Sequence, residues 1–265
     1  MRALVECPLE NFKDIRFVLT DMDETLTFKG RLAANTYNAL ERLQHANIRV
    51  IPVTAAPAGW CDQMARMWPV DGVIGENGGL FFRRGIQTHD LERDYWHQGQ
   101  AAELARQQRE VLISTICEQL PWARLAADQS FRQTSVAFDI PQESEKREQL
   151  SQVMIDAGAE YTFNNLWALA WFGRYDKLTM AQRVLRQVYG LAAGQELSQV
   201  FYSGDSLNDA PMFGHFKHTL GVSTVRDCLE ELPFKPAWIS AGAGGSGFVE
   251  AADAILKGQT SWRQS

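Results

Sequence analysis

The fold is decided by one stretch, Arg16-Phe17-Val18-Leu19-Thr20-Asp21-Met22-Asp23-Glu24-Thr25. A short apolar run ends here in two carboxylates spaced two residues apart, and a threonine follows them. This pattern predicts a buried parallel strand, over residues 15–20, that carries acids to its carboxyl end. Because ligands bind at that edge of an open α/β sheet, Asp-x-Asp-x-Thr at this place indicates phosphoryl transfer through an aspartyl-phosphate.

The composition is that of an ordinary globular protein and excludes some function classes. The 265 residues are 45% hydrophobic, enough for one large domain or two modest ones, and the net charge of −6 argues against a nucleic-acid surface. No apolar run reaches the roughly 18 residues of a membrane span. The chain does not begin with the apolar core of a signal peptide, and its cysteines match no metal spacing. We therefore expect a cytoplasmic protein with reduced thiols.

Strand and helix patterns alternate at both ends of the chain, which predicts a Rossmann-like parallel sheet of the α/β class. The expected strands are residues 15–20, 50–53, 70–75, 200–205 and 218–222, and the expected helices are residues 35–45, 59–67, 177–189, 208–213 and 247–256. Pro52 has no amide proton, so the second strand is expected to be distorted or open on one side.

The pattern changes over residues 84–172, where polar helical stretches stand beside short strand-like runs. Helices are expected over residues 101–118 and 143–157, and strands over residues 135–140 and 166–171. We interpret this region as an α+β insertion. The predicted domains are a core made of residues 1–83 and 173–265 and a cap made of residues 84–172.

Polar residues collect at one predicted edge of the sheet, each at a strand end or a helix start. Thr54 ends the second strand, Lys177 opens the helix after the insertion, and Asp205, Asn208 and Asp209 follow the fourth strand. Phosphoryl transfer asks for this set, because a phosphate dianion repels a carboxylate nucleophile. A hard cation with oxygen ligands must offset that repulsion, so we expect Mg²⁺ at this edge.

The residues divide the work of such a reaction. Asp21 attacks phosphorus, and Asp23 protonates the leaving oxygen and then activates water. Lys177 and Thr54 hold the phosphate oxygens, and Thr25 ties down the turn. The predicted metal-binding set is Asp21, Asp23, Asp205, Asn208 and Asp209, with Asp21 and Asp205 as direct ligands.

These segments resemble, in order, the four motifs of the haloacid dehalogenase (HAD) superfamily, and the resemblance covers essentially the whole chain. Asp21-Met22-Asp23-Glu24-Thr25 resembles the first motif, Val53-Thr54 the second, Lys177 the third and Gly204-Asp205-Ser206-Leu207-Asn208-Asp209 the fourth. The insertion resembles the α+β cap of the Cof-type, sugar-phosphatase and phosphomannomutase branch. Ile74-Gly75-Glu76-Asn77-Gly78-Gly79 is similar to the Glu-Asn-Gly turn that precedes the cap in that branch.

Two positions depart from the family pattern. Glu24 stands where a glycine usually follows the acid/base, at the start of the segment that forms the squiggle and flap. Ala55 and Ala56 follow Thr54 where the branch often has Gly-Arg, so this loop lacks an arginine for phosphate or substrate.

The resemblance implies that the cap closes over the phosphoryl site, excludes water and selects the substrate. Candidates on its inner face are Arg132, Asn164, Trp167, Trp171 and Arg174. An arginine can grip a second anionic group and a tryptophan can stack on a sugar. The apolar run around both tryptophans favours core or interface positions over contact with substrate, and the composition favours surface positions for the two arginines. The predicted substrate-binding set is Thr54, Ala55, Asn77, Arg132, Arg174 and Lys177.

The sequence therefore predicts a Mg²⁺-dependent phosphatase that hydrolyses a small phosphorylated metabolite, either a sugar phosphate or a phosphoglycerate derivative. A phosphomannomutase-like phosphotransferase shares the motifs and the cap type, and it stays open. A binding protein on a HAD scaffold that has lost catalysis is a third hypothesis. Against it stands the presence of every expected catalytic side chain: Asp21, Asp23, Lys177, Asp205 and Asp209.

Overall fold

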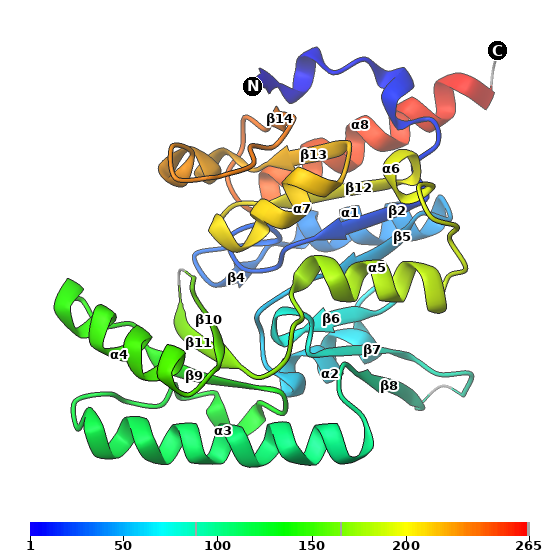
Figure 1. Cartoon of the computed structure of the whole chain (residues 1–265). Coiled ribbons are helices and arrows are strands. Elements are labelled where there is room, and N and C mark those ends of the chain that lie inside the picture. The colour runs from blue at the N-terminus through cyan, green and yellow to red at the C-terminus, as the bar shows by residue number, and fades with distance from the viewer. Residues whose placement is uncertain (88, 165, 264–265) are drawn as a thin grey trace.

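The computed structural model describes residues 1–87, 89–164 and 166–263, and its centre is a six-stranded parallel sheet (Figure 1). The strand order is β1-β14-β13-β12-β2-β5. The strands of the chain are β1 (Arg2–Ala3), β2 (Phe17–Thr20), β3 (Thr27–Phe28), β4 (Arg31–Leu32), β5 (Arg49–Pro52), β6 (Val73–Gly75), β7 (Leu80–Arg84), β8 (Leu91–Tyr95), β9 (Ser135–Asp139), β10 (Glu160–Phe163), β11 (Trp167–Trp171), β12 (Val200–Gly204), β13 (His218–Gly221) and β14 (Trp238–Ile239). The α-helices are α1 (Ala34–His45), α2 (Ala58–Met67), α3 (Gly99–Gln119), α4 (Ser144–Asp156), α5 (Lys177–Gln187), α6 (Glu196–Gln199), α7 (Ala210–His215) and α8 (Gly245–Arg263). Short 3₁₀ helices are η1 (Leu4–Glu6), η2 (Leu9–Phe12), η3 (Glu76–Gly78), η4 (Gln129–Phe131), η5 (Leu207–Asp209) and η6 (Ser223–Cys228).

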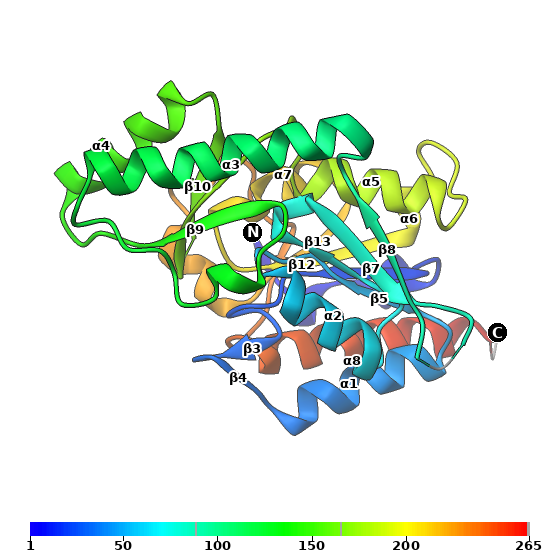
Figure 2. The same cartoon turned by 90° about the horizontal axis from the view of Figure 1, so that it is seen from below.

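Helices cover both faces of this sheet, with α1 and α8 on one side and α5 and α7 on the other (Figure 2). The packing of β2 explains why every residue of its apolar run is hydrophobic or buried. Val18 packs into the cluster that contains α1 and α8, whereas Phe17 and Leu19 pack into the cluster that contains α5 and α7. A strand buried on both faces needs apolar residues at every position, so the predicted α/β class is confirmed.

Strand β5 ends the six-stranded sheet, and Pro52 accounts for this. β5 pairs with β2, and on its other side the next strand, β6, meets it only through a bridge between Val53 and Ile74. Nearby, the Val50 N–H donates to the Asp71 carboxylate at 3.2 Å instead of to a strand carbonyl. The strand expected over residues 70–75 is therefore shorter than predicted and does not extend the parallel sheet. It joins β7 and β8 in a separate antiparallel sheet.

The insertion forms a second unit in which α3 and α4 lie outside a three-stranded sheet of order β10-β11-β9 (Figure 1). Strand β11 alternates between two environments. Ala168 and Ala170 pack with residues of α3 and α4, whereas Trp167, Leu169 and Trp171 face the core in a cluster with Ala55 and Tyr175. Both tryptophans are thus interface residues, one of the two positions that their apolar run favours.

The division into a core of residues 1–83 and 173–265 and a cap of residues 84–172 remains our proposal. Strand β8 falls inside the proposed cap in sequence, but it pairs with β7 in the same sheet as β6. Within the described residues, no helix combines the length and the apolar character that crossing a membrane requires.

A buried carboxylate joins the insertion to the core. Oε1 of Glu76 accepts the N–H groups of Ala58, at the start of α2, and of Gln133, at 2.9 and 2.8 Å. Oε2 accepts the N–H and hydroxyl groups of Thr134 and Ser135 at 2.6–2.9 Å. Since residues 133–135 lead into β9, one side chain fixes the place where the inserted sheet meets the core.

We expect Glu76→Gln to lower the free energy of unfolding by about 2–4 kcal/mol. Either orientation of the amide turns its NH₂ group toward two backbone N–H donors, and hydrogen bonds to a charged acceptor are each worth about 1.5–3 kcal/mol. Urea unfolding measures the change. Glu92→Gln is the matched control, because Glu92 is half-exposed and pairs with Arg83 at the surface. Equal stability of the two variants would contradict the junction role.

Candidate active site

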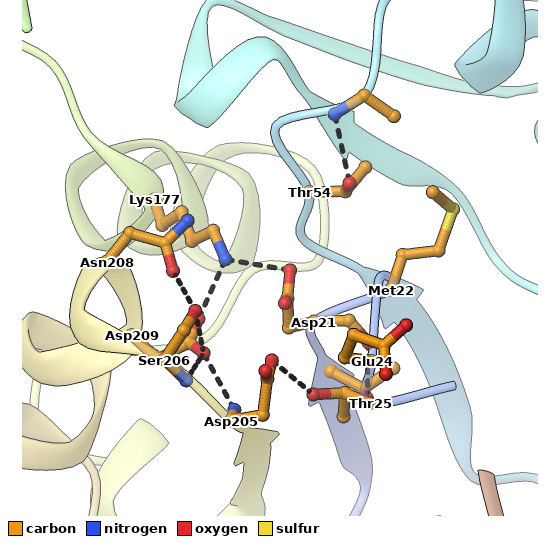
Figure 3. Close-up of polar contacts among 12 residues, drawn as sticks. Asp21, Met22, Glu24, Thr25, Thr54, Lys177, Asp205, Ser206, Asn208 and Asp209 are labelled. Atoms are coloured by element: carbon orange, nitrogen blue, oxygen red, sulfur yellow. Dashed lines mark hydrogen bonds and ion pairs between the residues drawn. The ribbon is translucent and has the colours of Figure 1, made fainter. Parts of the chain in front are cut away.

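The carboxyl ends of neighbouring strands bring the predicted site residues together (Figure 3). Asp21 directly follows β2, Asp205 directly follows β12, and Thr54 lies just beyond β5. The order β12-β2-β5 places all three at one edge of the sheet. The Asp21 N–H continues the ladder by donating to the Ser203 carbonyl at 2.8 Å, which fixes the position of its side chain.

Lys177 is the first residue of α5, and its side chain extends to this edge of the sheet. Its helix begins in a capping box, in which the Asp176 carboxylate accepts the Thr179 N–H at 2.7 Å. The Lys177 ammonium donates to Asp21 Oδ1 at 2.8 Å and to Asp209 Oδ1 at 2.7 Å, and all three side chains are buried. One lysine therefore holds the acids of two strand ends together.

Asp209 folds back onto its own strand end. Its Oδ2 accepts the N–H groups of Asp205 and Ser206 at 2.9 and 3.1 Å, and its Oδ1 accepts the Tyr202 hydroxyl at 2.5 Å. Gly204 makes this return possible, because a Cβ there would lie 2.4 Å from Asp209 Oδ2. The geometry indicates that Asp209 orients the turn around Asp205.

Three carboxylates at this edge can hold a metal ion. Oxygen atoms of Asp21, Asp205 and Asp209 lie within 4.8 Å of one another, and with the Lys177 ammonium they leave a formal charge of −2. Such a buried set of oxygen donors fits a hard divalent cation such as Mg²⁺. Asp23 does not belong to this cluster.

Burial and mutual repulsion change the proton affinity of these groups in the metal-free protein. Burial, together with the charges of Asp21 and Asp209, raises the pKa of Asp205 to about 9. Burial raises the pKa of Asp21 to about 6 despite Lys177, and burial with the charge of Asp21 raises the pKa of Asp23 to about 7. Burial alone would lower the pKa of Lys177, but Asp209 and Asp21 hold it above its ordinary value. A carboxyl that keeps its proton near neutral pH suits the acid role predicted for Asp23.

Thr54 and Asn77 form a second wall of the site. The Thr54 hydroxyl accepts the Ala56 N–H at 3.0 Å, so its own proton is free to be donated. Asn77 donates its N–H to the Thr54 carbonyl at 3.0 Å, and its buried side-chain amide has no partner among the described residues. Next to it, Gly78 packs directly against Asp176, at the start of α5. An unpaired buried amide at this place is consistent with the predicted substrate contact.

No protein-family model and no curated protein matches this chain. Solved structures do match it. A haloacid dehalogenase-like hydrolase from Bacteroides thetaiotaomicron superposes with a TM-score of 0.68 at 14% identity, covering 91% of this chain and 99% of that one. A HAD/COF-like hydrolase from Plasmodium vivax gives 0.67 at 14% identity, covering 94% and 100%. A trehalose-6-phosphate phosphatase related protein gives 0.59 at 12% identity, also covering 94% and 100%.

The chain has the haloacid dehalogenase fold. The expected fold class is confirmed by these superpositions. The four segments that resemble the HAD motifs in sequence meet at the edge described above.

Glu24, the first departure from the HAD pattern, adopts the backbone conformation that glycine would take. Its φ is +58°, in the left-handed region. Its side chain accepts the Lys29 N–H at 2.8 Å through Oε1, which closes the turn that leads to the β3–β4 hairpin. The flap segment therefore keeps a tight turn without glycine, and a carboxylate is placed beside the site.

Arg132 occupies the space beside the second departure, the Ala55–Ala56 loop. Its guanidinium donates to the Ala55 carbonyl at 2.9 Å and to both Asp128 carboxylate oxygens at 3.3 and 3.0 Å. It also lies over the Trp167 ring, 4.8 Å from the centroid, and its side chain is 0% exposed. These contacts favour a positioning role for Arg132 at the junction between cap and core. Arg174, the other predicted cap arginine, is exposed.

Asn164 lies at the end of β10, at the turn toward β11. Its Oδ1 accepts the N–H groups of Leu166 and Trp167 at 2.9 and 2.7 Å. Asn208, predicted as a metal ligand, accepts the Ser206 hydroxyl at 2.8 Å through its Oδ1. These roles in substrate or metal binding stay predictions.

Sequence reasoning missed two side chains that hold the acids in place. Thr25 donates its hydroxyl to Asp205 Oδ1 at 3.0 Å, so it does more than tie down its own turn. Tyr202 lies in the middle of a buried strand and donates to Asp209. The only signal in the sequence was a tyrosine within an apolar strand, since a buried hydroxyl needs a partner.

The raised carboxyl pKa values predict that the metal-free protein becomes less stable as the pH rises. Between the unfolded value near 3.8 and the folded values of about 6, 7 and 9, the native state binds more protons than the unfolded state. The stability that these protons contribute is lost as the pH rises through the folded values. We expect the melting temperature in EDTA to fall by roughly 5 °C or more from pH 5.5 to 9.

Mg²⁺ is expected to reverse this loss of stability with rising pH, because it binds the carboxylates best once they have lost their protons. It should therefore raise the melting temperature more at pH 8.5 than at pH 5.5. Asp205→Asn is the control variant, since it removes the most strongly raised carboxyl and should flatten the pH dependence in EDTA. Parallel curves for the two proteins would contradict the assignment of the effect to this cluster.

Proposed function

We propose that this protein is a Mg²⁺-dependent phosphatase that hydrolyses a small phosphorylated metabolite, a sugar phosphate or a phosphoglycerate derivative, through an aspartyl-phosphate. The observation that carries the proposal is the buried Lys177 ammonium between Asp21 and Asp209, beside Asp205, at the ligand-binding edge of the sheet. The HAD fold and its superposition on a trehalose-6-phosphate phosphatase related protein support the same reading.

In the first step, a carboxylate oxygen of Asp21 attacks the phosphorus atom and the bond from phosphorus to the alcohol oxygen breaks. Asp23 gives its proton to the departing oxygen, so a neutral alcohol leaves. Its pKa of about 7 keeps a large share of the proton in place near neutral pH. Lys177 and Thr54 donate hydrogen bonds to phosphoryl oxygens, which stabilises the charge that spreads over them in the transition state.

In the second step, Asp23 acts as a base. Its carboxylate takes a proton from water as the water oxygen attacks phosphorus, and the bond to the Asp21 oxygen breaks. Inorganic phosphate leaves and Asp21 returns as a carboxylate. A Mg²⁺ ion held by Asp21, Asp205 and Asp209 would reduce the repulsion between phosphate and carboxylates throughout.

We further propose that the protein works in the cytoplasm. All four cysteines are free, and two of them, Cys7 and Cys61, are buried, which suits a reducing compartment.

Phosphate release from a panel of sugar phosphates and phosphoglycerate derivatives, with Mg²⁺, tests the proposal directly. We expect release by the parent protein and less than about 0.1% of that rate with Asp21→Asn, which has no nucleophile. Asp253→Asn, a surface substitution in the pair with Arg42, should keep the parent rate. Conversion of a hexose 1-phosphate to its 6-phosphate would show the phosphotransferase instead. No turnover of any ester by folded protein would return the binding-protein hypothesis.

The acid role of Asp23 predicts a dependence on the leaving group. Asp23→Asn should slow hydrolysis of a sugar phosphate by roughly 10²–10⁴-fold, because its alcohol needs a proton to leave. With p-nitrophenyl phosphate, whose phenolate leaves unaided, we expect a burst of one equivalent of nitrophenol followed by slow turnover. Stopped-flow absorbance measures the burst. An equal loss in the first step for both esters would contradict general acid catalysis by Asp23.

A further inference from the structure

A cleft of about 520 Å³ opens from the catalytic edge toward the β10–β11 turn. Asp205 and Ser206 line it on the core side, and Phe163, Asn164 and Leu166 line it on the cap side. Since Asp205 belongs to the acidic cluster, the cleft begins where the phosphoryl group would be held. An alcohol attached to that phosphate extends into it.

The described residues that line this cleft include no lysine or arginine, and two of them are carboxylates outside the metal cluster, Glu24 and Asp227. Neither makes an ion pair within the part of the chain that the structure describes. The Oε1 atom of Glu24 takes only a backbone N–H, from Lys29. The cleft thus presents two uncompensated negative charges to whatever enters it.

The two buried cationic side chains near the site are held by carboxylates. Lys177 is shared by Asp21 and Asp209. Arg132 is buried against Asp128 and does not line the cleft, nor does Arg174. None of the described residues that line the cleft is therefore a cation that could receive a second anionic group of a substrate. Arg226 adjoins Asp227 and Lys29 contacts Glu24, but both lie outside the lining.

The rest of the lining suits hydroxyl groups and a hydrocarbon face. Thr224 presents a buried hydroxyl oxygen that has no partner among the described residues, and Asn164 brings a side-chain amide to the lining. The carboxylates of Glu24 and Asp227 can accept hydrogen bonds from substrate hydroxyls. Phe163 and Leu166 offer apolar contact to the C–H face of a sugar.

We propose that this cleft receives the alcohol part of the substrate and that Glu24 and Asp227 reject alcohols that carry a second anionic group. The inference rests on the proposed phosphatase activity and sharpens it. Phosphate monoesters of uncharged polyhydroxyl compounds are the substrates, whereas phosphoglycerate derivatives and bisphosphates are excluded. Like charges in a partly closed cleft give discrimination of this kind.

Two matched pairs of compounds test the proposal, because each pair differs by one carboxylate. These are glycerol 3-phosphate against 3-phosphoglycerate, and glucose 6-phosphate against 6-phosphogluconate. For the parent protein we expect kcat/KM at least about tenfold higher for the neutral member of each pair. The double variant Glu24→Gln with Asp227→Asn should reduce this ratio at least threefold, by improving the anionic member. The double variant Glu92→Gln with Asp253→Asn, which changes the net charge equally but lies at the surface pairs with Arg83 and Arg42, should leave the ratio unchanged.

Equal or better turnover of the anionic members by the parent would overturn the proposal, and so would an unchanged ratio in the double variant. p-Nitrophenyl phosphate separates this from failure of the phosphatase function, since its leaving group carries no second anionic group and its hydrolysis does not depend on the charge selection. Isothermal titration calorimetry with the Asp21→Asn variant in Mg²⁺ compares the affinities for the same pairs of compounds without turnover. Tighter binding of the neutral members supports the charge selection, and tighter binding of the anionic members refutes it.

Discussion

The buried ion network around Lys177 is the constraint on which the other features of the site depend. Taking three carboxylates out of water beside one ammonium is costly, and removing the ammonium would leave the acids without any compensation. The network also ties together elements far apart in the chain, since Asp21 follows β2, Lys177 begins α5 and Asp209 ends η5. The buried acids thus lower the free energy of unfolding of the ligand-free protein, and binding of a cation and a phosphate at this edge would raise it again.

The attachment of the cap is separate from this network and from the substrate cleft. Glu76 accepts hydrogen bonds from the start of β9, and Arg132 donates to the Ala55 carbonyl. Both contacts join the insertion to loops that follow β5 and β6, on the side of Thr54 and Asn77. The described residues of the β10–β11 turn that line the cleft, Phe163, Asn164 and Leu166, are not among the residues of these two anchors. One side of the cap is therefore held by buried polar contacts, and the other side is left to meet the substrate.

The central strand and the acids at its end could be predicted from the sequence, because they depend on a local pattern of residues. An apolar run ending in Asp21 needs no knowledge of its neighbours, and parallel topology then determines which ends meet. The roles of Arg132 and Thr25 could not be predicted in the same way. Arg132 is buried because Asp128 lies four residues earlier and the Ala55 carbonyl approaches from the loop after β5. Thr25 meets Asp205 only because β2 and β12 are neighbours in the sheet. Strand β8 was also missed, since it pairs with β7 through a hairpin that is polar in sequence.

Glu24 connects the backbone of the flap with the electrostatics of the cleft. Glu24 has a left-handed backbone conformation, which a glycine would adopt without strain. The glutamate therefore adds some backbone strain and places a carboxylate at the cleft. The charges of Glu24 and Asp227 make the two ends of the site electrostatically different. Lys177 and the predicted cation attract phosphate at the edge of the sheet, whereas the two carboxylates of the cleft repel anions. A phosphate monoester with one charged end can satisfy both regions in a single orientation. A substrate charged at both ends would have to place one of them against carboxylates, whichever way it entered.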